Sequence, residues 1–245
     1  MLYTFAMKPK ISEFQERVLK ALSGKIDDFY LAGGTALSLY YFQHRESVDL
    51  DFFTRRLDKM RVLEIINLLS HKLNKKIELI AQSQANKNMV RVMVYSMRID
   101  KNHSLKMDFV EDYLGLIKTP KLINGIRVLS LEDINIRKIY ALTGTLEKED
   151  IIGRRITGGG REEAKDFYDL YCLSNIFMRL SDFSFRHSNQ MTREALIRWF
   201  RTYSRFNIKT GLLELKLKKD VDYKDMERHF KREIDKILEK EVDEI

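Results

Sequence analysis

The stretch of sequence that decides the fold is residues 26–54, IDDFYLAGGTALSLYYFQHRESVDLDFFT. An apolar segment from Phe29 to Ala32 predicts a short buried strand, and the pair Gly33-Gly34 predicts a tight turn after it. A helix is expected from about Thr35 to Phe42, followed by a strand at 48–54 in which residue types alternate. This order of strand, glycine turn, helix and strand indicates an α/β arrangement near the start of the chain.

Two aspartates on the strand at 48–54 carry the most specific chemical signal. Residues two apart in a strand point to the same side, so Asp49 and Asp51 share one face. The opposite face, with Val48, Leu50 and Phe52, is expected to be buried. Two carboxylates this close repel each other, and the pair is costly unless a cation or solvent compensates it. Because such a pair by itself more often marks a solvated strand end, its neighbours decide its meaning.

A third carboxylate is expected from a neighbouring strand. The segment LKMDFV at 105–110 alternates as a strand does and contains Asp108. Hard oxygen donors on adjacent strands suit Mg²⁺ (or Mn²⁺), which binds a few carboxylates together with substrate phosphates. Two such ions, about 4 Å apart, can activate an attacking hydroxyl and stabilise a leaving pyrophosphate. The three aspartates are therefore predicted metal ligands.

The Gly33-Gly34 turn lies 15 positions before Asp49, counted from Gly34. Because it opens a helix, its backbone amides and the positive helix end can receive a triphosphate. The hydroxyls of Thr35 and Ser38 are further candidate donors, and glycine allows a phosphate to approach the main chain closely. The alternative is a turn that needs glycine only for its shape, since the sequence is neither a Gly-x-Gly-x-x-Gly fingerprint nor a P-loop.

The rest of the chain divides into two parts. A helix at 58–73 and strands in KIELIA, MVRVMVYSM and LKMDFV are expected to complete the first part. After Ser130 the pattern becomes helical, with helices predicted at 131–146, 161–174, 192–206 and 222–242. The predicted fold class is α+β: a mixed β-sheet with helices in domain 1–125, followed by a helical bundle in domain 126–245.

Composition excludes several classes of protein. The chain has 245 residues, 44% hydrophobic and 33% charged, which is typical of globular proteins and excludes a disordered or collagen-like chain. A single cysteine, Cys172, excludes an internal disulfide and fits a reducing compartment. The sequence contains neither a signal peptide nor a run of 18 apolar residues. We therefore expect a soluble cytoplasmic protein with no membrane contact.

The charge is concentrated in one segment. From Arg186 to Lys219 nine Lys and Arg residues stand against two Glu residues, a net charge of +7. The periodicity predicts an amphipathic helix from Thr192, a possible N-cap, to Phe206, with three arginines on its polar face. These are Arg198, Arg201 and Arg205. Such a face suits contacts to an RNA backbone, but it equally suits a solvated helix face above an apolar stripe. The alternating charges after Asp220 predict an exposed helix without chemistry.

The segment at 26–54 resembles the signature of the AbiEii/AbiGii abortive-infection toxins, which belong to the polymerase-β-like nucleotidyltransferase superfamily. The resemblance implies that the mixed sheet of domain 1–125 is nucleotidyltransferase-like. The resemblance continues at Leu131-Glu132-Asp133 with Lys138 after it, and at Lys165-Asp166-Phe167-Tyr168-Asp169-Leu170, and covers about 21–175. The later segments are similar to the family's lysine motif and its Lys/Arg-Asp-x-x-Asp motif. The wider superfamily has Gly-Ser where this chain has Gly-Gly-Thr.

The resemblance implies roles for the residues that match. Gly33, Gly34 and Thr35 would hold phosphates, and Asp49 and Asp51 would bind metal. A third metal ligand in this family rests on superfamily analogy alone.

Three further roles come from the later motifs and the loop. Lys138 would contact the nucleotide phosphates, and Asp166 would assist at the active site. Arg45, which follows His44, would bind a phosphate or brace the loop. The structural alternative is that Asp166 or Asp169, three residues apart on one helix face, anchors its helix to a neighbouring cation.

The predicted activity is transfer of a nucleoside monophosphate from an NTP to an acceptor, with release of pyrophosphate. The resemblance implies a toxin of a type IV toxin-antitoxin pair in phage defence, with a cognate antitoxin encoded nearby and tRNA as the modified RNA. One alternative is a non-catalytic nucleotide or nucleic-acid-binding module, against which the intact Asp49 and Asp51 argue. Another is a metal-dependent phosphatase or nuclease. The Gly-Gly turn argues against this alternative, because such a turn favours a triphosphate donor over hydrolysis by water.

Overall fold

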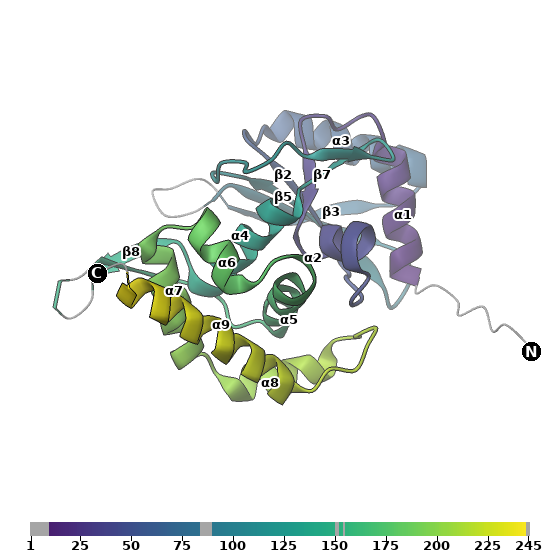
Figure 1. Ribbon diagram of the computed structural model, residues 1–245. Coiled ribbons are helices and arrows are strands. Elements are labelled where there is room, and N and C mark those ends of the chain that lie inside the picture. The colour runs from purple at the N-terminus through teal and green to yellow at the C-terminus, as the bar shows by residue number, and fades with distance from the viewer. Residues whose placement is uncertain (1–9, 84–89, 150–151, 154, 244–245) are drawn as a thin grey trace, which may run out of the picture. The chain divides into compact units, whose positions relative to one another are not determined.

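The chain forms two compact units that are interleaved along the sequence. The computed structural model describes residues 10–83, 90–149, 152–153 and 155–243 (Figure 1). The first unit comprises Met1–Ala36 and Ser47–Ser130, and the second comprises Leu37–Glu46 and Leu131–Ile245. A short internal segment therefore belongs with the C-terminal half of the chain.

A mixed seven-stranded sheet forms the centre of the first unit, in the order β3-β4-β5-β2-β1-β7-β6. Its strands are β1 (Tyr30–Ala32), β2 (Asp49–Thr54), β3 (Ile77–Ser83), β4 (Val92–Arg98), β5 (Ser104–Glu111), β6 (Lys121–Ile123) and β7 (Ile126–Val128). β2 runs parallel to β5 and antiparallel to β1, and β1 runs parallel to β7. The predicted fold class, α+β with a mixed sheet, is confirmed. The β6–β7 hairpin was not predicted.

Alternation along β2 produces one buried face. Leu50 and Phe52 are completely buried, and the Phe52 ring stacks on Phe109 of β5 with 5.4 Å between centroids. Burying large side chains of this kind is the main favourable contribution to folding. The expectation that Val48 shares this face is wrong, because Val48 precedes the strand and is 50% exposed.

Three helices accompany the sheet: α1 (Lys10–Leu22), α2 (Gly33–Ala36) and α3 (Lys59–Leu73). α3 begins where Asp58 accepts a hydrogen bond from the Met60 amide, and ends at Asn74 in the left-handed conformation. The helix predicted at 35–42 begins two residues earlier and continues into the second unit as a π-helix, η1 (Leu37–Phe42).

The second unit is mainly helical, as predicted. Its elements are η1, α4 (Leu131–Thr143), β8 (Leu146–Glu149), β9 (Arg155–Gly158), α5 (Ala164–Cys172), η2 (Leu173–Phe177), α6 (Leu180–His187), α7 (Gln190–Thr202), α8 (Arg205–Glu214) and α9 (Tyr223–Asp243). β8 and β9 form an antiparallel hairpin. The internal segment joins this unit through backbone hydrogen bonds, in which the Glu46 amide donates to Lys216 and the Lys218 amide donates to His44.

An aromatic core holds the helices of the second unit together. Phe167 of α5 is completely buried and contacts Phe230 of α9 and Trp199 of α7, with ring centroids 4.8 Å and 6.0 Å away. The tail helix α9 was expected to be exposed, but one of its faces is buried, including Phe230 and Ile234. No helix within the described part of the chain combines the length and the apolar character needed to cross a bilayer.

The helix predicted at 192–206 is in fact two helices. Asn189, and not Thr192, caps the start of α7, and α7 ends at Thr202. Ser204 then caps α8 by accepting a hydrogen bond from the Asn207 amide. Phe206, expected to be in the apolar stripe, is 74% exposed.

Candidate active site

The aspartates predicted from sequence meet on one face of the sheet in the first unit. β2 and β5 pair in register, so that Asp51 lies beside Asp108 and Asp49 lies beside Lys106. Side chains at paired positions of neighbouring strands point to the same side. We call Asp49, Asp51 and Asp108 the carboxylate face. The side chains of Asp49 and Asp108 are 25% and 16% exposed, so a ligand can reach them.

Lys106 is the cation of this face, and sequence reasoning missed it. Its Nζ lies 2.8 Å from Asp108 Oδ2 and 4.0 Å from Asp49 Oδ2. Burial alone would lower the pKa of Lys106, but the hydrogen bond to Asp108 and the charges of the three aspartates raise it above its usual value. Three carboxylates and one ammonium leave the face with a net charge of −2.

Gly33 links the glycine turn to the carboxylate face. Its φ of +69° is left-handed, and a Cβ built at this position would overlap the Asp51 carboxylate. Any other residue would therefore be strained by its backbone and would displace Asp51. Glycine is needed at position 33 because the Asp51 carboxylate lies against the main chain there.

The start of β2 is fixed by two buried side chains. The Thr35 hydroxyl donates to the Asp49 carbonyl and lies 2.7 Å from the Ser47 hydroxyl. Gln15 of α1 donates to the carbonyls of Ser47 and Asp49, at 3.0 Å each. Thr35, predicted to hold phosphate, thus positions the start of β2. No sequence signal indicated Gln15.

A second group of predicted site residues lies in the second unit and is buried. Lys138 Nζ of α4 lies 2.6 Å from Asp166 Oδ1 and 2.6 Å from Asp169 Oδ2 of α5. Arg45 donates two hydrogen bonds to Asp169, from Nε at 2.6 Å and from Nη2 at 2.8 Å. We call Arg45, Lys138, Asp166 and Asp169 the charge cluster. Its two cations and two carboxylates balance.

Neighbouring side chains complete the partners of the charge cluster. His44 Nε2 lies 2.7 Å from Asp169 Oδ1, and Arg161 Nε donates to Asp166 Oδ2 at 2.6 Å. Burial alone would raise the pKa of Asp169, but Lys138 and Arg45 hold it well below its ordinary value. These contacts match the structural alternative, in which the two aspartates anchor their helix to neighbouring cations.

A family model confirms the resemblance over nearly the whole chain. Residues 17–245 match the model described as the nucleotidyl transferase AbiEii toxin of type IV toxin-antitoxin systems. The chain belongs to this family. It is a nucleotidyltransferase toxin, and its substrate is an NTP.

Individual proteins resemble the chain in sequence or in fold. An uncharacterised Aquifex aeolicus protein is 30% identical over 173 residues, which are 68% of each chain. A candidate nucleotidyltransferase from Helicobacter pylori shares the fold at 16% identity, with a TM-score of 0.55 over 94% of this chain and 95% of that one. MenT4, a nucleotidyltransferase toxin from Mycobacterium tuberculosis, also shares the fold at 15% identity. The TM-score is 0.53 over 93% of this chain and 82% of MenT4.

The carboxylate face suits the divalent cation that nucleotidyltransferases generally use. As the side chains stand, no three His, Cys, Asp or Glu residues among those described converge on one point that could hold an ion. The donors are nevertheless of the right class, because Mg²⁺ takes one or two carboxylates and completes its shell with phosphates and water. The residual charge of −2 also matches one divalent ion. Asp49 and Asp51 therefore fit as its ligands.

An apolar depression continues the carboxylate face outward. It is lined by Ala81, Val92 and Val94 together with the ends of β3 and β4, and has a volume of about 440 Å³. Val94 is the register partner of Asp108, so its side chain lies on the same face of the sheet as the carboxylates.

Ser38 was predicted to bind phosphate, but its hydroxyl donates to the Arg45 carbonyl and is buried in the second unit. The predicted phosphate ligands Lys138 and Arg45 are likewise engaged by the aspartates of the charge cluster. Of the predicted residues, the aspartates of the carboxylate face and the Gly33-Gly34-Thr35 segment come together in the first unit. Asp169, the second aspartate of the KDFYDL motif, was not predicted as a site residue.

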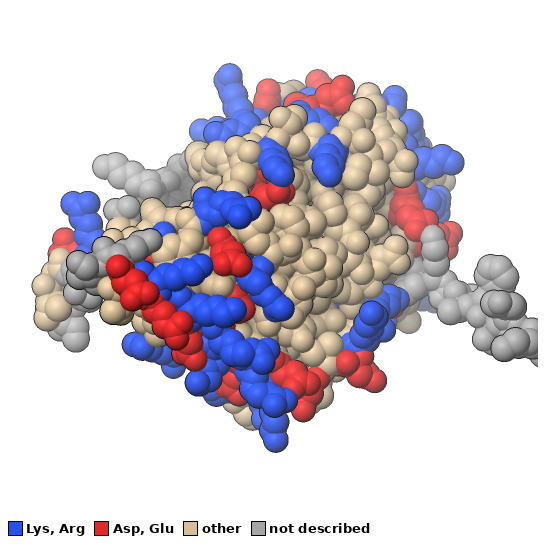
Figure 2. All heavy atoms as spheres, viewed as in Figure 1, with Lys and Arg blue, Asp and Glu red and all other residues tan. Residues whose placement is uncertain are grey.

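The predicted RNA-binding arginines do not share a helix face. Arg198 and Arg201 lie in α7, whereas Arg205 begins α8 and pairs with Glu227 at 2.7 Å. Neither Arg198 nor Arg201 has an ion-pair partner among the described residues. In Figure 2, Lys and Arg side chains in the lower half of the view alternate with Asp and Glu side chains. Charges of the two signs are thus mixed on this side.

Proposed function

We propose that this AbiEii-family toxin transfers a nucleoside monophosphate from an NTP to a hydroxyl group of an RNA, and that the RNA is tRNA. The acceptor oxygen forms a bond to the α-phosphorus, and the bond from that phosphorus to the bridging oxygen breaks. Pyrophosphate leaves with the electron pair, and the hydroxyl proton passes to solvent. The observation that supports the proposal is a solvent-accessible group of three aspartates beside the Gly33-Gly34 turn.

The residues of the first unit have distinct parts in this proposal. Asp49 and Asp51 hold Mg²⁺ (or Mn²⁺), with Asp108 as a third ligand. The ion, when bound, supplies positive charge to the transferring phosphoryl group. Lys106 neutralises part of the face before the ion arrives. The amides after Gly33 receive phosphate oxygens, and the depression beside Val94 receives an apolar part of a substrate.

The residues of the second unit act under a constraint. Lys138 is a candidate phosphate ligand, but its ammonium already has two carboxylate partners. A donor phosphate has to replace Asp166 or Asp169 at Lys138 before it can bind there. In this proposal Asp166 holds Lys138 until the exchange, and Asp169 holds Arg45.

The remaining parts of the proposal concern the cell. A cognate antitoxin encoded nearby restrains the toxin, and both act in the cytoplasm in defence against phage. Arg198 and Arg201, the α7 arginines without ion-pair partners, contact the RNA backbone.

The test is incorporation of label from each α-³²P-labelled NTP into total RNA, with and without Mg²⁺. Asp51→Asn should lower incorporation about a thousandfold or more, because charge stabilisation in the transition state is lost. Asp27→Asn makes the same chemical change at an exposed aspartate of the first unit and should retain full activity.

Two outcomes would contradict the proposal. Equal incorporation by a folded Asp51→Asn variant would remove the metal assignment. Release of labelled monophosphate or phosphate without labelled RNA would indicate hydrolysis, and so a phosphatase or nuclease.

A further inference from the structure

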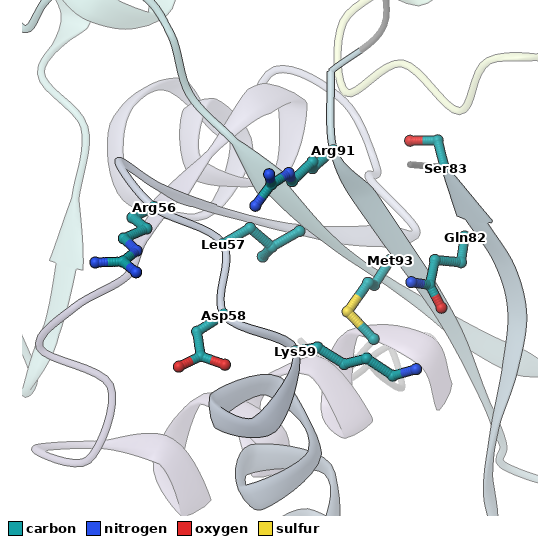
Figure 3. Close-up of a pocket in the computed structure, with 8 residues that line it drawn as sticks. All are labelled: Arg56, Leu57, Asp58, Lys59, Gln82, Ser83, Arg91 and Met93. Atoms are coloured by element: carbon teal, nitrogen blue, oxygen red, sulfur yellow. The ribbon is translucent and has the colours of Figure 1, made fainter. Parts of the chain in front are cut away.

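A pocket of about 520 Å³ lies in the first unit, away from the carboxylate face (Figure 3). Its walls come from the loop between β2 and α3, the end of β3 and the start of β4. Met93 at its floor is the register partner of Phe109, whereas Asp108 pairs with the next residue, Val94. Because alternate residues point to opposite sides of a sheet, the pocket and the carboxylates are on opposite faces.

Three cations surround the pocket, and two of them are uncompensated. Arg56 and Lys59 form no ion pair with any residue that the structure describes. Arg91 has Glu111 as its partner at 3.6 Å, a distance too long for a strong hydrogen bond. Asp58 is the only acid in the lining, and its carboxylate accepts a hydrogen bond from the Met60 amide. The lining residues therefore carry three positive charges and one negative charge. Glu111, which also accepts a hydrogen bond from the Leu57 amide, compensates Arg91 in part and leaves Arg56 and Lys59 as the excess of positive charge.

The start of α3 lies in the pocket wall. The 15-residue helix begins at Lys59, and the Asp58 carboxylate before it caps the helix by accepting a hydrogen bond from the Met60 amide. This carboxylate already compensates the partial positive charge of the helix end. A phosphate in the pocket would therefore be bound by the guanidinium and ammonium groups.

The floor of the pocket is apolar. Leu57 and Met93 are 7% and 3% exposed, and Figure 3 shows both side chains between Arg91 and Lys59. The Gln82 side chain, at the edge, has no hydrogen-bond partner among the described residues. The volume is within the roughly 300–1,000 Å³ typical of small-molecule sites, and is several times larger than a bare phosphate needs. An anion that also has a flat, weakly polar body matches this lining.

We propose that this pocket binds a free nucleoside monophosphate, at a site separate from the one that carries out transfer. Arg56, Lys59 and Arg91 hold the phosphate, and the base lies on Leu57 and Met93. Gln82 supplies one donor and one acceptor to the edge of the base.

The experiment uses methionine methyl groups as local reporters. The full-length protein, labelled with ¹³C at the methionine methyls, is titrated with AMP in the absence of divalent metal. The Met93 resonance, assigned from a Met93→Leu variant, should shift and saturate. Met226, which is buried in the second unit, should not shift. Absence of a saturable Met93 shift would overturn the proposal.

Charge variants separate a specific site from general attraction to a basic protein. The double variant Arg56→Gln/Lys59→Gln should raise the Kd for AMP at least about tenfold, because each cation donates a charge-assisted hydrogen bond. The control Lys20→Gln/Lys121→Gln removes the same charge from exposed positions of the same unit. Equal Kd values for AMP in the two double variants would contradict the proposal that AMP binds in this pocket. Asp51→Asn should leave the Met93 shift unchanged, and loss of the shift there would mean that AMP binds at the carboxylates instead.

Two further ligands identify the source of the phosphate. Inorganic phosphate should bind at least tenfold more weakly than AMP, since it cannot reach the apolar floor; equal affinity would exclude the base. A short single-stranded RNA without a terminal phosphate should not shift Met93. If it shifts Met93 while AMP does not, the pocket belongs to an RNA path and the proposal of a free nucleotide is wrong.

Discussion

The carboxylate face and the charge cluster contain almost the same chemical groups but differ in how their charges are compensated. On the carboxylate face, three aspartates share one lysine and remain partly exposed. In the charge cluster, two aspartates meet two cations in a buried site, with His44 and Arg161 as additional partners. The carboxylate face therefore keeps a net negative charge, whereas the charges of the charge cluster compensate one another.

The difference separates a site that needs a ligand from one that does not. Buried charges are tolerated when each is paired and hydrogen-bonded, so the charge cluster is stable without any substrate. Neighbouring carboxylates with more negative than positive charge repel each other, and a bound cation relieves this repulsion. Measurements that alter one partner at a time can therefore show which region maintains the fold and which serves the chemistry.

The largest effect on stability is expected from Asp169→Ala. It leaves Arg45 and Lys138 buried with less compensation, which should lower the free energy of unfolding by about 3–5 kcal/mol. Urea denaturation measures the change. Asp182→Ala, which breaks an exposed pair with Lys240, should cost less than about 1 kcal/mol. A loss at position 169 as small as at position 182 would show that the cluster does not maintain the fold.

Acid should weaken the charge cluster next. Burial raises the pKa values of Asp166 and Asp169, but the charge of Lys138, with Arg161 or Arg45, lowers them below the ordinary value. The unfolded chain therefore takes up protons first, and the stability contributed by these groups is lost as pH falls from about 4 through the folded pKa values. Urea midpoints should decline across this window, and Asp169→Asn should flatten the decline. Parallel pH profiles would contradict the assignment.

Removing the cation of the carboxylate face should strengthen metal binding, whereas removing a charge from the charge cluster should destabilise the fold. Lys106→Gln changes its net charge from −2 to −3, so the Kd for Mn²⁺ should fall about tenfold, after allowance for solvent screening. Calorimetric titration with Mn²⁺ measures this change. Lys121→Gln, at an exposed position on β6, is the matched control. An unchanged or higher Kd would mean that Lys106 does not compete with the metal.

The smallest expected effect concerns RNA binding by arginines that differ in whether an acidic side chain compensates them. Arg198→Gln/Arg201→Gln removes two cations that have no ion-pair partner among the described residues. It should flatten the slope of log affinity for RNA against log salt by about 1.4. Arg205→Gln should change the slope less, because Glu227 already compensates Arg205. Fluorescence anisotropy with labelled RNA gives both slopes. A parental slope in the double variant would place the RNA elsewhere.

Local patterns were enough to predict the elements that position the carboxylate face. Alternation placed β2, and the glycine pair marked the start of the next helix. The β6–β7 hairpin was also within reach, because Asn124 and Gly125 form a strong hairpin signal between apolar residues. The break between α7 and α8 was hidden because the apolar spacing continues through Tyr203 to Phe206, although Ser204 is a good N-cap.

Features that depend on distant segments could be predicted only in part from the sequence. Asp108 was expected on a strand beside Asp49 and Asp51, but its pairing with Asp51 and the position of Lys106 depend on the register of two strands that are far apart in the chain. The same holds for the pairing of Arg45 with Asp169, since one motif contains the cation and another contains its partner. Neither segment indicates by itself that its charged residue is buried.

Interleaving of the two units also has a consequence for synthesis on the ribosome. Arg45 is made 124 positions before Asp169, an interval of roughly 6–25 s at about 5–20 residues per second. The segments that form β1 and β2, on either side of Leu37–Glu46, are available to pair with each other much earlier. A chain terminated before residue 169 can therefore contain all three aspartates of the carboxylate face, yet it leaves Arg45 without the carboxylate that holds it.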